Sequence, residues 1–118
     1  MNPYRSKYGS KKATIDGITF DSQKEAARYT ELRLLQGAGK ITGLETQVKY
    51  ELIPSQKRDG KVVERGVSYI ADFVYFQDGK KIVEDVKGYR DPKSAGYAKF
   101  VLKRKMMLYF HGIQIKEV

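Results

Sequence analysis

Cysteine is absent from this chain of 118 residues, and histidine occurs only once. Without cysteine there is no disulfide framework and no zinc site built from thiolates, which is typical of a reducing cytoplasm. The single histidine excludes metal sites that need two imidazole ligands. No apolar run approaches the roughly 18 residues of a membrane span, and the N-terminal MNPYRSKYGSKK lacks the apolar segment of a signal peptide. We therefore expect a soluble protein of the cytoplasm.

Acidic residues are in the minority, with 14 Asp and Glu against 23 Lys and Arg and a net charge of +9. Such a balance indicates a polyanionic partner such as nucleic acid, although solvated lysines alone explain many basic chains. The acids at Asp72, Glu84 and Asp85 stand out because they lie among apolar residues. Acids within strands of so basic a chain need a compensating interaction, and metal coordination is the simplest one.

The length of the chain fits one domain with one core, and no repeat or low-complexity block suggests a linker. Residues 1–12 combine basic residues with tyrosine and glycine, which predicts a basic, flexible N-terminal arm. This arm is either a solvated tail or a DNA-contacting segment. Residues 13–118 are predicted to form the single folded domain.

Apolar periodicity and glycine or proline punctuation predict the regular elements. In chain order they are a small hairpin over residues 13–20 around Asp16-Gly17, a helix over 22–36, a strand over 46–53, a hairpin over 67–88, a helix over 94–110 closed by His111-Gly112, and an edge strand over 113–118. Residues 57–61 (KRDGK) are predicted to be a turn or loop tip, which either contacts phosphate or is ordinary surface.

The hairpin over residues 67–88 organises the rest of the chain. Its two runs rich in Val, Ile, Tyr and Phe flank Asp78-Gly79, the strongest short-range hairpin signal. If these two residues form the loop, Gln77 pairs with Lys80, and this pairing fixes the register of both strands. A three-residue loop with a glycine bulge would shift the pairing by one residue.

The two-residue register places two carboxylates and an amine together. Asp72 lies opposite Asp85, with Cβ atoms roughly 4.5–5.5 Å apart, and such a like-charged pair is destabilising unless something compensates it. Lys87 lies on the same face as Asp85, because side chains alternate along a strand. Glu84 points to the other face and is left out of the site.

The sequence Asp72, then Asp85-Val86-Lys87, resembles the motif of the PD-(D/E)XK nuclease superfamily, with Ala71 where that family often has proline. More narrowly, residues 7–118 resemble small phage-encoded nucleases similar to the Holliday-junction resolvases of the endonuclease I class. The order of helix, three strands, helix and strand is the αβββαβ core of this superfamily. We therefore expect a restriction-endonuclease-like α/β (α+β) fold, with a mixed central sheet flanked by helices.

The resemblance implies Mg²⁺-dependent hydrolysis of DNA phosphodiesters, with Mn²⁺ as a substitute. Asp72, Asp85 and the backbone carbonyl of Val86 would be metal ligands, and Lys87 would orient the attacking water. Glu25 of the first helix would be the further catalytic acid and metal ligand. Its alternative is a capping box with Ser22, in which the glutamate only bonds the helix N-terminus.

The resemblance also implies branched or junction DNA as the substrate and a possible homodimer, although an exonuclease or a nickase would use the same residues. Basic side chains near the site or in the arm are expected to bind DNA, namely Lys7, Lys11, Lys12, Arg90, Lys93, Lys99 and Lys103. Two rival functions are a non-catalytic nucleic-acid-binding module and a structural subunit of a phage particle. The latter explains the charge but not the convergent acids.

Overall fold

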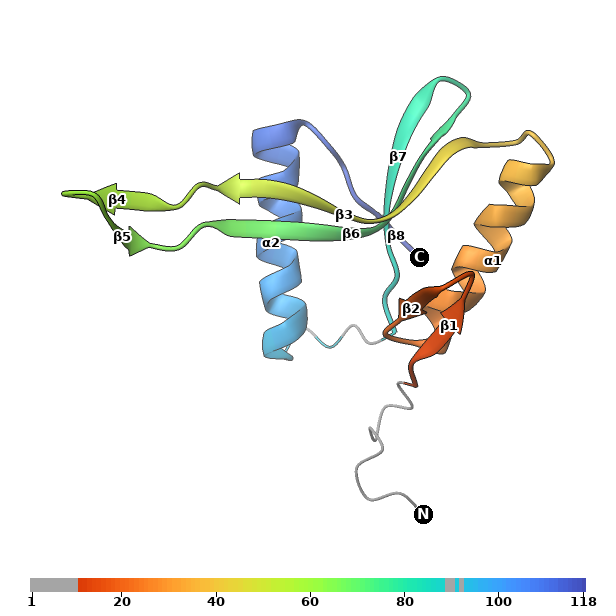
Figure 1. Cartoon of the computed structure of the whole chain (residues 1–118), viewed down its shortest axis with the longest axis horizontal. Helices are drawn as coiled ribbons and strands as arrows, with labels where there is room; N and C mark the ends of the chain where they lie inside the picture. The colour runs from red at the N-terminus through yellow and green to blue at the C-terminus, as the bar shows by residue number, and fades with distance from the viewer. Residues whose placement is uncertain (1–10, 89–90, 92) are drawn as a thin grey trace, which may run out of the picture.

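The protein, represented by a computed structural model, is described over residues 11–88, 91 and 93–118. The predicted N-terminal arm lies almost wholly outside these residues, as do Lys7 and Arg90. The elements follow one another as β1 (Ala13–Ile15), β2 (Ile18–Phe20), α1 (Gln23–Gly37), β3 (Thr42–Ile53), β4 (Gln56–Arg58), β5 (Lys61–Glu64), β6 (Val67–Gln77), β7 (Lys80–Asp85), α2 (Ala95–His111) and β8 (Lys116–Glu117) (Figure 1).

The central sheet has the strand order β3-β6-β7-β8. Its first three strands are antiparallel, and β8 pairs in parallel with β7, so the sheet is mixed. With α1 before β3 and α2 between β7 and β8, the predicted order of helix, three strands, helix and strand is confirmed. The fold is α+β, with the predicted small hairpin β1–β2 preceding α1.

Both helices begin and end at residues that suit helix termini. The hydroxyl of Ser22 accepts a hydrogen bond from the backbone N–H of Glu25, and Ser94 caps α2 in the same way through Tyr97. Gly112 ends α2 in the left-handed conformation, with φ of 66°, which glycine adopts without strain. Among the described residues, neither helix is long and apolar enough to cross a membrane.

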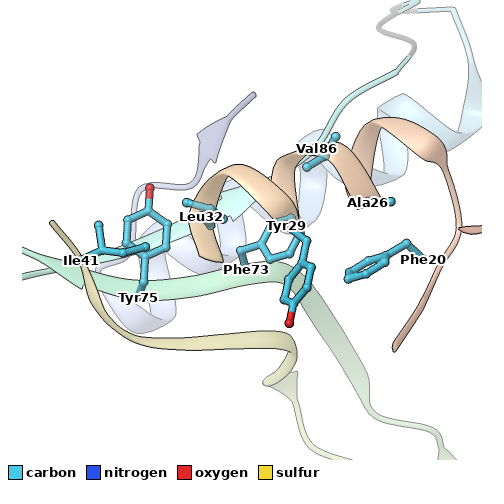
Figure 2. Close-up of a cluster of buried hydrophobic side chains, with 8 residues drawn as sticks. All are labelled: Phe20, Ala26, Tyr29, Leu32, Ile41, Phe73, Tyr75 and Val86. Carbon is cyan, nitrogen blue, oxygen red and sulfur yellow. The ribbon is translucent and has the colours of Figure 1, made fainter. Parts of the chain in front are cut away.

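Each helix covers its own apolar cluster. The α1 cluster contains Phe20, Ala26, Tyr29, Leu32, Ile41, Phe73, Tyr75 and Val86, and Figure 2 shows their side chains between the helix and the strands. The α2 cluster contains Leu52, Tyr69, Ala71, Val74, Val83, Phe100, Met107 and Ile115. The two helices therefore pack against different faces of the sheet.

Strands β3 and β6 exchange faces at Gln47 and Asp72. Ala71 packs in the α2 cluster and Phe73 in the α1 cluster, although residues two apart on a regular strand share a face. The pairing between the strands passes from Thr46↔Phe73 to Val48↔Ala71 without a pair at Gln47, whose φ is 53°. Asp72 thus lies where the ladder is interrupted, between the two cores.

The remaining differences from the expected elements are local. Strand β3 begins at Thr42 rather than Thr46, while the last strand is only Lys116–Glu117. The turn expected over residues 57–61 is present, but β4 and β5 extend it into a hairpin.

Glu84 is fully buried and lies on the α1 side of the sheet. The guanidinium of Arg28 donates to both of its oxygens, from Nε at 2.8 Å and from Nη2 at 2.6 Å, and Tyr75 donates a third hydrogen bond. Burial on its own would raise the pKa of Glu84, but the hydrogen bonds and charge of Arg28 and the Tyr75 hydroxyl lower it below its ordinary value. Glu84 is therefore satisfied structurally and stays apart from the candidate site, as its register predicted.

We predict that Glu84→Gln lowers the free energy of unfolding by about 2–4 kcal/mol, somewhat below the cost of breaking a fully buried ion pair because Arg28 keeps some exposure. A carboxylate with a lowered pKa stabilises the fold above its unfolded pKa and loses that effect as the pH falls, so the cost should shrink in acid. Urea unfolding at pH 7 and pH 4 measures both effects.

Glu31 supplies the matched control, because it bonds the same Arg28 at 3.0 Å from an exposed position. Glu31→Gln should cost less than about 1 kcal/mol. Equal losses in the two variants would show that the buried pair is no more important than the exposed one.

Candidate functional site

The register of the β6–β7 hairpin is the one predicted. Asp78 and Gly79 both have positive φ, 52° and 75°, as a two-residue type I′ turn requires. Gln77 pairs with Lys80, and the ladder continues without a shift to Phe73↔Glu84. The bulged three-residue alternative is therefore not formed.

Asp85 is the buried acid at the end of β7, and both of its oxygens have partners. The Tyr69 hydroxyl donates to Oδ1 at 2.7 Å, and the ammonium of Lys87 lies 2.6 Å from Oδ2. Lys87 Nζ also lies 3.4 Å from the ring centroid of Phe100 in α2, so its charge is held by a carboxylate and an aromatic face together. This pair is thus fixed at the boundary between β7 and α2.

Asp72 approaches this pair from the interrupted position of β6. The pairing of β6 with β7 ends at Phe73↔Glu84, one pair before Asp72 would face Asp85. The carboxylate of Asp72 instead accepts the backbone N–H of Val86 at 2.7 Å. Burial, together with the charges of Asp85 and Glu25, raises the pKa of Asp72 to about 7, although the Val86 hydrogen bond and the Lys87 charge act in the opposite direction. The surroundings of Asp72 therefore disfavour the charged form of its carboxylate.

Glu25 stands at the first turn of α1, half-buried, and faces the same region. A backbone hydrogen bond at Asp21 lowers the pKa of the Glu25 carboxylate, so the bond is made one residue before the N-cap Ser22 that the expected capping box would use, while the Ser22 hydroxyl accepts the N–H of Glu25. Burial and the neighbouring charges of Asp21 and Asp85 raise the pKa of Glu25, while the charge of Lys87 lowers it. Glu25 therefore combines a structural bond at the helix terminus with electrostatic coupling to the Asp85–Lys87 pair.

The expected metal ligands are only partly brought together. Within residues 11–88, 91 and 93–118, no three side chains of His, Cys, Asp or Glu form a group able to hold a metal ion. Glu25 thus does not join Asp72 and Asp85 in a three-carboxylate cluster. Two carboxylates and the Val86 carbonyl remain as the candidate oxygen ligands, and Mg²⁺ sites commonly use one or two carboxylates with several waters.

An open pocket lies beside Asp85 and Lys87, on the α2 side of the sheet. Lys99 and Lys103, two of the basic residues expected to bind DNA, line it from the helix, and Phe100 forms part of its wall. Its charged groups are thus one acid and three lysines. A pocket with this charge suits an anionic ligand such as a phosphodiester.

The other basic residues expected to bind DNA lie elsewhere. Lys11 and Lys12 are exposed just before β1, and Lys93 is exposed before α2 and does not line the pocket. Lys7 and Arg90 fall outside the described residues.

Two residues that hold the site were not identified from the sequence. Lys24 Nζ donates to the backbone carbonyl of Lys87 at 2.5 Å and so ties α1 to the end of the Asp85-Val86-Lys87 segment. Tyr69 positions Asp85, although in the sequence it is one aromatic residue among several in a strand. In the sequence, these contacts were indicated only indirectly, by the position of Lys24 next to Glu25 and by the hairpin register that places Asp85.

A family model described as "Protein of unknown function (DUF1064)" matches residues 5–116. Neither the curated proteins nor the solved structures contain a match.

We predict that Asp72→Asn raises the Tm of the metal-free protein by about 3–8 °C at pH 8 and by roughly a third as much at pH 5. An acid whose pKa is raised on folding destabilises the folded state as the pH rises above its unfolded value, and the amide removes that charge while it still accepts the Val86 N–H. Thermal unfolding in chelator measures the difference.

Asp78→Asn is the control, since Asp78 is exposed in the turn and asparagine tolerates its positive φ. It should show no pH-dependent gain. A lower Tm for Asp72→Asn at pH 8 would contradict an unfavourable charge at Asp72.

Proposed function

This chain belongs to the DUF1064 family of proteins of unknown function, and for it we propose metal-dependent hydrolysis of DNA phosphodiesters. The observation that carries the proposal is the convergence of Asp72, Asp85 and Lys87 at one strand end beside a lysine-lined pocket. A partly buried acid with a pKa of about 7, Asp72, is stabilised by a cation next to it, and a lysine-lined pocket is stabilised by an anion. Metal and phosphate together satisfy both.

The residues present fit a hard divalent cation, Mg²⁺ or Mn²⁺, held by the carboxylates of Asp72 and Asp85 and by the carbonyl of Val86. When bound, such a cation stabilises negative charge on the phosphate and lowers the pKa of water. Glu25 lies within electrostatic reach of this set and is proposed to act from the side of α1.

The protein's own side chains have separate tasks in this proposal. Lys87, held by Asp85 and Phe100, keeps a positive charge at the place where the attacking water and the phosphate meet. Tyr69 holds Asp85 in one orientation, and Lys24 holds the backbone of Lys87. Lys99 and Lys103 bind the DNA backbone at the mouth of the pocket. By resemblance, the products carry 5′-phosphate and 3′-hydroxyl ends.

The substrate proposed is branched DNA, as in the resolvases that the chain resembles. One chain carries one such site, and cutting two strands across a junction takes two, so this selectivity implies a homodimer. A nickase or an exonuclease would use the same site as a monomer.

A non-catalytic nucleic-acid-binding module is the second candidate, and one feature favours it. The Asp85–Lys87 ion pair is complete without a metal, and Glu25 does not form a three-acid group with the aspartates in the described part of the chain. On this account the acids are neutralised by lysines, and the basic pocket alone does the binding.

We predict that Asp85→Asn and Asp72→Asn each abolish Mg²⁺-dependent cleavage of branched DNA without weakening DNA binding. Each change removes a metal ligand but also lessens the repulsion of phosphate. Cleavage is measured on a synthetic four-way junction with Mg²⁺, Mn²⁺ or chelator, and binding is measured in chelator. Asp78→Asn, again exposed in the turn, should cleave like the wild type.

Cleavage by Asp85→Asn at the wild-type rate would sink the nuclease assignment. Binding without any cleavage by the wild type, on branched or linear DNA, would favour the non-catalytic module.

We further predict that Lys99→Ala with Lys103→Ala lowers the slope of log affinity against log salt by roughly 1.8, since each lost phosphate contact removes about 0.9 on duplex DNA. The affinity should fall on all sequences alike, because phosphate contacts carry no base information. The control is Lys40→Ala with Lys80→Ala, two exposed lysines that do not line the pocket. An unchanged slope in the first variant would show that this face of α2 is only solvated.

A further inference from the structure

The hairpin formed by β4 and β5, called here the β4–β5 arm, extends beyond the central sheet (Figure 1). Every residue of both strands is exposed, including Val62 and Val63, each 53% exposed. An isolated two-stranded hairpin is marginally stable in water because it buries little apolar surface. The arm therefore adds no side chains to the hydrophobic core, which indicates a role other than stabilising the fold.

The junction between the arm and the sheet is a defined structural feature. At Gly66 a Cβ atom would lie only 2.8 Å from the carbonyl oxygen of Ile53 and 3.1 Å from the nitrogen of Ser55. The two backbone segments that connect the arm to the sheet therefore lie too close together here for any side chain. Pro54, next to this crossing, restricts the backbone further. The arm thus leaves the sheet in a fixed direction rather than as a loose loop.

The charges on the arm are mostly positive. Lys57, Arg58 and Lys61, counted with Arg65 directly after β5, outnumber Asp59 and Glu64, and among the described residues none of these four cations takes part in an ion pair. Arg58 pairs directly with Lys61 across the turn, so two cations share one face of the hairpin tip. Like charges in this position repel each other, and a bound anion would relieve the repulsion.

The arm is also placed at a useful distance from the candidate site. The arm leads directly into β6, whose first residues Ser68, Tyr69 and Ile70 line the pocket. Roughly ten residues separate Ile70 from the tip at Gly60, and at about 3.3 Å per residue this is on the order of 30 Å. One turn of B-DNA measures about 34 Å, and its major groove admits a two-stranded ribbon.

We propose that the β4–β5 arm is a DNA-binding ribbon that lies along a duplex about one helical turn from the phosphates held at the Asp85–Lys87 pocket. The proposal rests on the proposed function only in taking duplex DNA as the ligand. The basic tip, with Arg58 and Lys61, contacts phosphates, and the arm lengthens the bound duplex beyond the pocket. Its four cations favour DNA over a second copy of this basic chain.

The test compares two double variants. The arm variant carries Arg58→Ala and Lys61→Ala together, and the control carries Lys40→Ala and Lys80→Ala together. Lys61 and Lys80 each follow an Asp-Gly turn and are exposed, so both variants lose two charges from similar surfaces. Binding to duplexes of 24 and 8 base pairs is measured in chelator over 50–200 mM salt. On the long duplex the arm variant should lose roughly 1.8 from the salt slope, a relative change in affinity of about 12-fold across this range. On the short duplex it should match the control.

Arg58→Lys with Lys61→Arg should restore the slope, because charge alone is needed at phosphate contacts. A slope equal to that of the control on the long duplex would overturn the proposal. So would a change of oligomeric state in sedimentation without a change of slope, which would make the arm an interface between copies. Because binding is measured without metal, failure of the arm proposal is distinguishable from failure of cleavage.

Discussion

The structure depends on one constraint, which is that β3 and β6 change faces at Gln47 and Asp72. In β6, Tyr69 and Ala71 before this point pack in the α2 cluster, whereas Phe73 and Tyr75 beyond it pack in the α1 cluster. The interruption frees Asp72 from the ladder and directs its carboxylate to the N–H of Val86. The end of β7 thereby meets groups from both layers, with Lys24 bonded to it and Glu25 within electrostatic reach on one side, and Phe100 on the other.

The three acids of the central hairpin are balanced to different degrees, and this difference separates scaffold from site. Glu84 is held by Arg28 and Tyr75, and its pKa is lowered. Asp85 is held by Tyr69 and Lys87. Within the described part of the chain, Asp72 accepts the Val86 N–H but forms no ion pair, and its pKa rises to about 7 although the charge of Lys87 lowers it. Of the three acids, Asp72 is therefore the one that a bound cation would stabilise most.

Much of this arrangement could be predicted from sequence because it follows from local rules. The Asp78-Gly79 turn fixed the hairpin register, Ser22 and Gly112 marked helix ends, and the spacing of Lys99 and Lys103 placed both on one helix face. The exchange of faces could not be predicted, since it depends on a non-glycine residue, Gln47, with positive φ. The contacts of Lys24 and Tyr69 depend on packing between elements that are distant in the sequence. The strands of the β4–β5 arm are exposed on both faces, so they have no alternation of apolar and polar residues from which strands could be predicted.

The central claim is that Asp72 and Asp85 together attract a divalent cation at the end of β7. The most direct measurement is the paramagnetic broadening of backbone amide signals by Mn²⁺ at neutral pH, without DNA. The claim predicts saturable broadening that begins at Val86 and Lys87 in the wild type and is lost in Asp85→Asn. Broadening that is absent from these amides, or that persists unchanged in Asp85→Asn, would contradict it.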